Sequence, residues 1–92
     1  MRECITLRYY EINEHPRDRN LRIKNIDTYG KAKRLEEIGC KFEVELLSTG
    51  LYHADIQFKG KQISNSVFEP KDSEEGFAYI FDTAYKKLIG KW

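Results

Sequence analysis

The sequence predicts an α+β domain in which an antiparallel meander sheet packs against two helices on one face, in the order β-β-α-β-β-β-α. Three observations lead to this fold class. An amphipathic pattern with helical spacing lies near the C-terminus, a shorter one lies near the middle, and three segments with alternating apolar residues lie between them. A chain of 92 residues has room for one hydrophobic core. We therefore expect a single domain over residues 1–92.

The first 26 residues predict a pair of strands. Apolar residues alternate and then change parity once, which indicates a strand with a β-bulge. Residues 15–20 contain proline, aspartate and asparagine, which are typical of a turn, and Leu21 with Ile23 then begins a short return strand. The alternating residues are Ile5, Leu7, Tyr9, Tyr10 and Ile12.

A short helix is expected over about residues 28–38. Asp27 is suited to cap its N-terminus, and Gly39 is suited to end it. The apolar residues that line one side of this helix are Ala32, Leu35 and Ile38.

The next two segments predict a β-hairpin. Residues 40–46 and 52–58 alternate between apolar and polar, and Ser48-Thr49-Gly50 between them suits a three-residue hairpin loop. Closing this loop opposite Leu47 and Leu51 sets the register of the two strands. The apolar pairs that result are Leu46 with Tyr52, Val44 with Ala54, Phe42 with Ile56, and Cys40 with Phe58.

A tight turn at Lys59-Gly60 predicts a third strand. Closing that turn opposite Phe58 and Lys61 continues the apolar face of the hairpin. It pairs Ile56 with Ile63 and Tyr52 with Val67.

The last element is an amphipathic helix over roughly residues 73–89. Asp72 and Glu75 have the spacing of a capping box, and Gly90 is suited to end the helix. Apolar residues at helical spacing form its buried side, namely Phe77, Phe81, Ala84 and Leu88.

Composition excludes several classes of protein. Hydrophobic residues make up 40% of the chain, aromatic residues 13% and charged residues 34%, as in a folded, soluble domain. No apolar run approaches the roughly 20 residues of a membrane helix, and no secretory signal is recognisable, so we expect a cytoplasmic protein without membrane contact. Cys4 and Cys40 lie in no Cys-x-x-Cys motif, which favours free thiols.

The net charge of +1 hides an asymmetry along the chain. Residues 1–34 have a formal charge of +4, and residues 35–92 have a formal charge of −3. Such a division is found in proteins with a surface that faces nucleic acid or an acidic partner, and also in domains whose charges serve solubility alone.

The polar side of the predicted hairpin is a candidate partner-binding surface. The register places Glu43 opposite Asp55 and Glu45 opposite His53, and two facing carboxylates are unfavourable unless a cation lies between them. One alternative is a divalent metal held by Glu43, Asp55 and His53, and another is a solvated face whose acids are screened by nearby lysines. A docking face for a basic partner is compatible with either.

The basic first third contains a candidate nucleic-acid-binding surface. Lysine and arginine neutralise phosphates, and nearby tyrosines can stack on bases. The alternative is an exposed loop kept soluble by its charges, with Tyr9, Tyr10 and Tyr29 packed in the core. The basic residues of this candidate surface are Arg17, Arg19, Arg22, Lys24, Lys31, Lys33 and Arg34.

No pattern in the sequence predicts catalysis. His15 and His53 lie at no spacing from a serine, cysteine or aspartate that supports a nucleophile, and no phosphate-binding loop or zinc-binding helix occurs. We therefore expect a protein that is not an enzyme and that uses no cofactor and no metal.

Two segments resemble nucleic-acid-binding modules. Residues 5–39 contain Leu7-Arg8-Tyr9-Tyr10-Glu11, a basic turn, and Asp27-Thr28-Tyr29 at the start of a helix, and they resemble the arm-type DNA-binding module of phage integrases. Residues 28–89 are similar in element order to double-stranded-RNA-binding domains. The last helix opens with Glu74 and Glu75 where that family has lysines, which argues against duplex RNA binding.

In size, in sheet-and-helix plan and in its lack of catalytic motifs, the chain also resembles the small phage-encoded inhibitors known as anti-CRISPR proteins. That resemblance implies a non-enzymatic inhibitor, from a phage or mobile element, that binds a nucleic-acid-handling protein or nucleoprotein complex. Direct DNA or RNA binding through the basic hairpin at residues 17–24 is the alternative. The target and the oligomeric state stay open.

Overall fold

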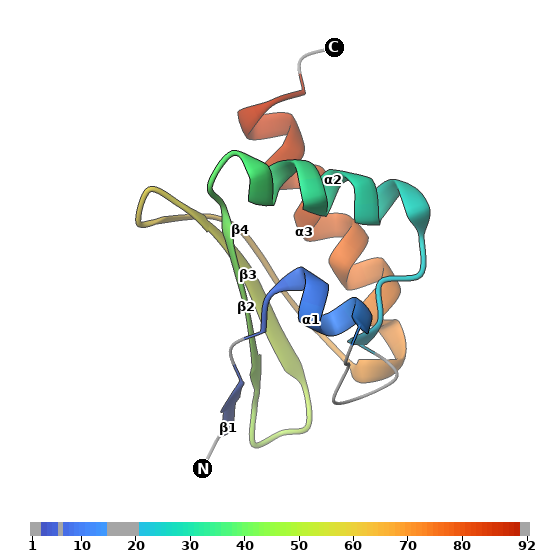
Figure 1. Cartoon of the computed structure of the whole chain (residues 1–92). Helices are drawn as coiled ribbons and strands as arrows, with labels where there is room; N and C mark the ends of the chain where they lie inside the picture. The colour runs from blue at the N-terminus through green and yellow to red at the C-terminus, as the bar shows by residue number, and fades with distance from the viewer. Residues whose placement is uncertain (1–2, 6, 15–20, 91–92) are drawn as a thin grey trace.

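The computed structural model describes residues 3–5, 7–14 and 21–90, and in this part of the chain it confirms an α+β fold (Figure 1). An antiparallel sheet has the strand order β1-β2-β3-β4. The α3 helix lies against β3 and β4, and α2 packs on α3. The elements are β1 (Glu3–Ile5), α1 (Tyr9–Glu14), α2 (Ile26–Glu37), β2 (Lys41–Leu46), β3 (Tyr52–Phe58), β4 (Lys61–Phe68), the short 3-10 helix η2 (Pro70–Asp72) and α3 (Ser73–Leu88).

The predicted element order is wrong in its first part. The expected bulged strand ends at Ile5, and the residues assigned to its second half form the α1 helix. The apolar pattern that changes parity here has the spacing of a helix, because Tyr9 and Ile12 are three residues apart and both are buried. Glu11 stabilises the helix start, because its carboxylate accepts a hydrogen bond from the backbone N–H of Arg8 at 2.8 Å.

The predicted return strand is also absent from the described residues. Leu21 and Ile23 are buried in the core, but Ile23 lies in irregular backbone and neither residue belongs to a strand. The predicted turn at residues 15–20 lies outside the described residues. The partner of β1 is instead β2, through pairs such as Glu3 with Leu46 and Ile5 with Val44.

The α2 helix begins two residues earlier than predicted. Asn25 caps it in place of Asp27, because its side-chain oxygen accepts from the N–H groups of Asp27 at 2.8 Å and Thr28 at 3.1 Å. At the other end Gly39 has a φ of 106°, which a glycine adopts without strain, and its N–H donates to the carbonyl of Glu36. Ile38, predicted to lie on the apolar side of the helix, falls beyond its last residue and is 40% exposed.

The register of the first hairpin is confirmed for three of the four predicted apolar pairs, and the fourth, Cys40 with Phe58, is not formed because β2 begins at Lys41. Leu46 pairs with Tyr52, Val44 with Ala54, and Phe42 with Ile56. Val44, Ala54 and Ile56 are almost inaccessible to solvent, so this face of the sheet forms one side of the core.

The predicted register of β4 is wrong over most of the strand. Phe58 pairs with Lys61 beside the turn, as predicted, but an irregularity at Ile56/Gln57 then shifts the pairing by one residue. Tyr52 therefore pairs with Phe68 and not with Val67. The shift buries the larger Phe68 ring and leaves Val67 51% exposed on the opposite face.

The same shift places Ser64, and not Ile63, opposite Ile56 on the core side of β4. Ser64 is 5% exposed, and no described residue gives its hydroxyl a hydrogen-bond partner. An unpaired buried hydroxyl costs about 1–3 kcal/mol of desolvation. Ser64→Ala is therefore expected to raise the free energy of unfolding by about 1 kcal/mol in urea titrations. The half-buried Ser66→Ala is the control, and a loss of stability in Ser64→Ala would contradict the placement of the hydroxyl.

The α3 helix matches its predicted range closely, but its start differs. Pro70 begins η2, and the side chain of Asp72 makes no capping hydrogen bond, so the predicted capping box does not form. The aromatic side of α3 closes the core. The Phe77 ring meets the Phe42 ring edge-on at 5.6 Å and the Phe68 ring at 5.3 Å, and Phe81 lies 5.0 Å from Phe42.

Candidate protein-binding face of the sheet

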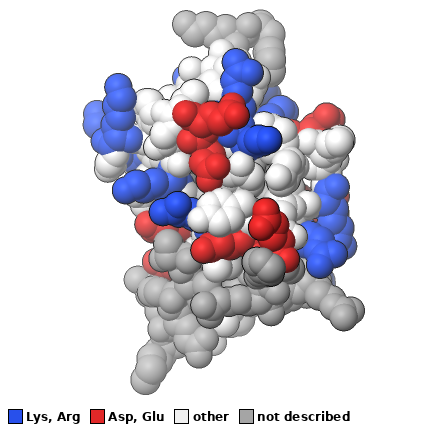
Figure 2. All heavy atoms as spheres, in the orientation of Figure 1, with Lys and Arg blue, Asp and Glu red and all other residues white. Residues whose placement is uncertain are grey.

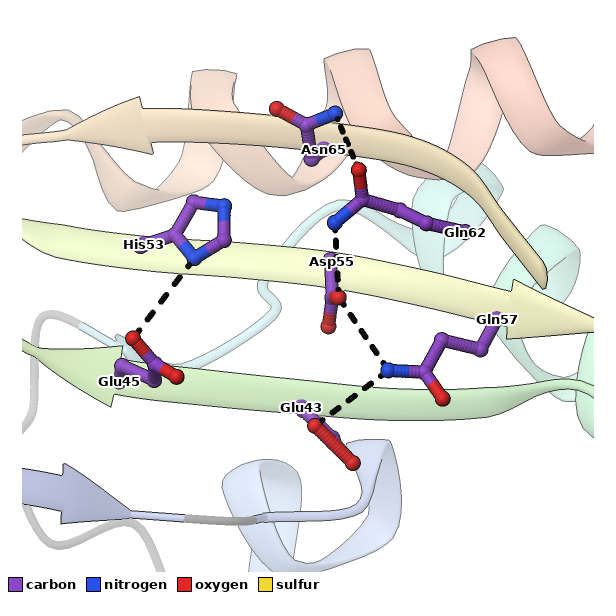
Figure 3. A network of polar contacts seen from close by, with 7 residues as sticks. All are labelled: Glu43, Glu45, His53, Asp55, Gln57, Gln62 and Asn65. Atoms are coloured by element: carbon purple, nitrogen blue, oxygen red, sulfur yellow. Dashed lines mark hydrogen bonds and ion pairs between the residues drawn. The ribbon is translucent and has the colours of Figure 1, made fainter. Parts of the chain in front are cut away.

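The face of the sheet opposite the core, which we call the outer sheet face, carries a group of polar side chains from β2, β3 and β4 (Figure 3). The predicted juxtapositions are confirmed, because Glu43 pairs with Asp55 and Glu45 with His53. The seven side chains of this group are Glu43, Glu45, His53, Asp55, Gln57, Gln62 and Asn65.

Asp55 is the centre of the group and is only 8% exposed. Its carboxylate accepts hydrogen bonds from the amide nitrogens of Gln62 at 2.9 Å and Gln57 at 3.3 Å. The amide of Asn65 donates in turn to the side-chain oxygen of Gln62 at 3.1 Å, which holds that glutamine in place. Neutral amides therefore satisfy a buried carboxylate for which the structure shows no lysine or arginine partner among the described residues.

Gln57 also explains how two carboxylates face each other across β2 and β3. Its amide nitrogen lies 3.5 Å from Oε2 of Glu43 while it donates to Asp55, so it bridges the two acids (Figure 3). Like charges directly opposite are destabilising unless donors are shared between them. The Gln57 amide therefore lies between the two carboxylates, where the sequence suggested a cation.

The other end of the outer sheet face combines a titratable pair with an apolar side chain. Nδ1 of His53 lies 3.9 Å from Oε2 of Glu45, and both side chains are 28% exposed. This pair becomes an ion pair only when the imidazole is protonated. Val67 is the strand neighbour of His53 on β4 and is half exposed, so it adds an apolar contact point beside the acids.

The described residues do not support the metal alternative. Among them, no three histidine, cysteine, aspartate or glutamate side chains come together to hold a metal ion. The imidazole of His53 points toward Glu45, while Asp55 points toward Gln57 and Gln62 (Figure 3).

Sequence reasoning missed the three amides of this group. Gln57 had a readable signal, because it has the same parity on β3 as His53 and Asp55 and so must share their face. Gln62 and Asn65 had no unambiguous signal, because the face of the sheet on which each side chain lies depends on the register irregularity beside Gln57.

The predicted basic surface is only partly assembled. Lys31 on α2 is bonded to Asp82 on α3, which neutralises one of its charges. Lys33 and Arg34 on α2 are exposed, and so are the loop residues Arg22 and Lys24, while Arg17 and Arg19 lie outside the described residues. Figure 2 shows that, on the face carrying α1 and α2, lysine and arginine side chains are interspersed with aspartate and glutamate.

Of the three tyrosines that could stack on bases or pack in the core, Tyr9 lies in the core. Tyr9 is buried and meets the half-buried Tyr29 ring edge-on at 5.7 Å. Burial and a hydrogen bond to Glu36 raise the pKa of the Tyr9 hydroxyl well above its usual range. Of the three, Tyr10 is the most exposed, at 36%.

Cys40 is a free thiol, as predicted, and burial raises its pKa, so it stays protonated at neutral pH. The side chain of Cys4 lies outside the described part of the chain.

Comparison with known proteins gives no family and no relative. No family model matches the sequence, and neither a curated protein nor a solved structure is significantly similar to it. Within the described ranges, no helix has both the length and the apolar character needed to cross a bilayer.

Proposed function

We propose that this chain is a non-enzymatic binding protein that docks through the outer sheet face onto a basic surface of a partner protein. The observation that carries the proposal is that the neutral amides of Gln57 and Gln62 hold the carboxylates of Glu43 and Asp55 in place. A surface that is held rigid before binding loses little conformational freedom when a partner arrives.

Electrostatic complementarity defines the kind of partner. Glu43, Glu45 and Asp55 contribute negative charge to one strand-paired surface, and positive groups on a partner are attracted to it and oriented by it. Val67, half exposed beside His53, supplies apolar contact area of the kind that strengthens the centre of an interface.

Within this proposal, the partner is a nucleic-acid-handling protein complex, and the chain is an inhibitor from a phage or mobile element that acts in the cytoplasm. Surfaces that bind phosphates are rich in lysine and arginine, so an array of fixed carboxylates is a suitable competitor for them. Direct nucleic-acid binding has less support, because Lys31 is neutralised by Asp82 and α3 begins with the exposed acids Glu74 and Glu75.

The test is a charge change on the outer sheet face that leaves the hydrogen bonds of Asp55 with Gln57 and Gln62 intact. Glu45→Lys with Val67→Lys is expected to weaken retention of the partner by about tenfold or more, since one attractive charge and one apolar contact are replaced by repulsion. Partners are captured from nuclease-treated lysate of the cells in which the chain occurs, identified by mass spectrometry, and then titrated as purified proteins.

Glu74→Lys with Tyr79→Lys is the matched control, because both side chains are exposed on α3 and the change in net charge is the same. Far-UV circular dichroism checks that both variants fold. Equal loss of binding in both variants, or retention of nucleic acid alone in the untreated lysate, would refute the proposal.

A further inference from the structure

A pocket of about 450 Å³ opens between α1, α2 and the first half of β2. This volume falls within the usual range for ligand sites of roughly 300–1,000 Å³. Its floor is apolar and its mouth carries charged side chains. Ala32, Leu35, Phe42, Ile56 and Phe81 contribute apolar lining.

The pocket lies beside an open strand edge. The β1 strand pairs only with Val44–Leu46, which leaves the first half of β2 without a described strand on that side. The N–H of Leu47 donates to the carbonyl of Leu51, so the odd-numbered residues of β2 direct their backbone groups toward β3. The N–H and C=O of Phe42 therefore point toward the open edge, and no described residue outside the strands bonds to them.

The acidic and basic side chains at the pocket mouth differ in their contacts. The carboxylate of Glu36 acts on the Tyr9 hydroxyl and raises its pKa, and Glu43 lies near the Gln57 amide. Among the described residues, the guanidinium of Arg8 contacts the Tyr10 hydroxyl and ring and no carboxylate, and Lys41 has no ion pair. Within the part of the chain that the structure describes, Arg8 and Lys41 are therefore two cations at the mouth that no carboxylate neutralises.

We infer that this groove binds an extended peptide segment that continues the line of β1 along β2. The peptide backbone pairs with Phe42, one apolar side chain enters the pocket, and acidic side chains beside that anchor meet Arg8 and Lys41. Strand addition of this kind obtains affinity from main-chain hydrogen bonds and specificity from side-chain pockets. The inference does not depend on the proposed function, because it rests on the apolar pocket and the Phe42 edge, although Glu43 belongs both to the outer sheet face and to the pocket lining.

The experiment is a titration of the 15N-labelled chain with a capped heptapeptide whose central phenylalanine is flanked by threonines and then glutamates. Chemical shift changes are expected at the backbone amides of Arg8, Gly39, Lys41 and Phe42. A matched peptide with lysines in place of the glutamates should bind about tenfold more weakly. A third peptide, N-methylated at the residue that pairs with Phe42, should also bind more weakly, because it lacks one main-chain donor.

Charge-reversal variants test whether the peptide preference depends on the pocket mouth or on other parts of the surface. Arg8→Glu with Lys41→Glu is expected to reverse the preference in favour of the lysine peptide, while Lys33→Glu on the exposed side of α2 leaves it unchanged. Octanoate is the second probe, since a small apolar carboxylate fits the same pocket chemistry. Binding of octanoate without binding of the peptide, shift changes confined to the outer sheet face, or no change at all would overturn the inference.

Discussion

Phe68→Ala is expected to lower the free energy of unfolding by about 3 kcal/mol or more, whereas Val67→Ala should change it by at most about 0.5 kcal/mol. Phe68 is 8% exposed and meets the Phe77 ring at 5.3 Å, so its truncation leaves a cavity between β4 and α3. Val67 is half exposed on the outer sheet face and has little buried area to lose. Urea unfolding followed by circular dichroism measures both changes.

The comparison tests the observed register of β4 directly. The register expected from the turn alone places Val67 in the core opposite Tyr52, and the observed register gives that place to Phe68. A large loss of stability at position 67 with a small one at position 68 would show that the strand is paired without the shift.

The two hairpins differ in how far sequence determines register. In the first, apolar residues occur at one parity only on each strand, so a slip of one residue would expose Val44 and Ala54 and bury acids. In the second, β4 has apolar residues at both parities, and Ile63 and Phe68 differ by an odd number of positions. Pattern and turn geometry therefore leave two registers open on β4, and packing against α3 selects between them.

The N-terminal segment shows a different limit. Its apolar residues fit an interrupted strand and a short helix equally well, because one change of parity over a few residues resembles helical spacing. The deciding signal was Glu11. Its carboxylate accepts a hydrogen bond from the N–H of Arg8, three residues earlier, and this bond is one half of a capping box. The buried irregular segment with Leu21 and Ile23 has no local signal of this kind, since only contacts with distant residues keep it inside.

At the candidate site, the sequence predicted the acids and missed what holds them. Register alone brought Glu43 to Asp55 and Glu45 to His53. The amides that satisfy Asp55 come from β3 and from the shifted part of β4, so their contribution is visible only in the folded sheet.

Gly76→Ala is expected to destabilise the fold by about 2 kcal/mol, although alanine is the better helix former by about 1 kcal/mol. Gly76 is buried on α3, and a Cβ atom there would lie within 2.7 Å of three atoms of the Phe68 ring. The Phe68 ring also packs edge-on against the Phe77 ring, which leaves it little room to move. Gly30→Ala on α2 is the matched control, because no atom of the described residues lies within 4 Å of its added methyl group and stability should rise by about 1 kcal/mol.

A double-mutant cycle identifies the cause of the Gly76 effect. If the clash with the Phe68 ring is responsible, then Gly76→Ala introduced into Phe68→Ala should cost nothing or restore part of the lost stability, because the methyl group enters the space that the ring has left. The coupling free energy should then be about 2 kcal/mol or more. Additive losses would instead mean that Gly76 is needed for the backbone of α3 itself, and the close contact between β4 and α3 would not be what constrains this position.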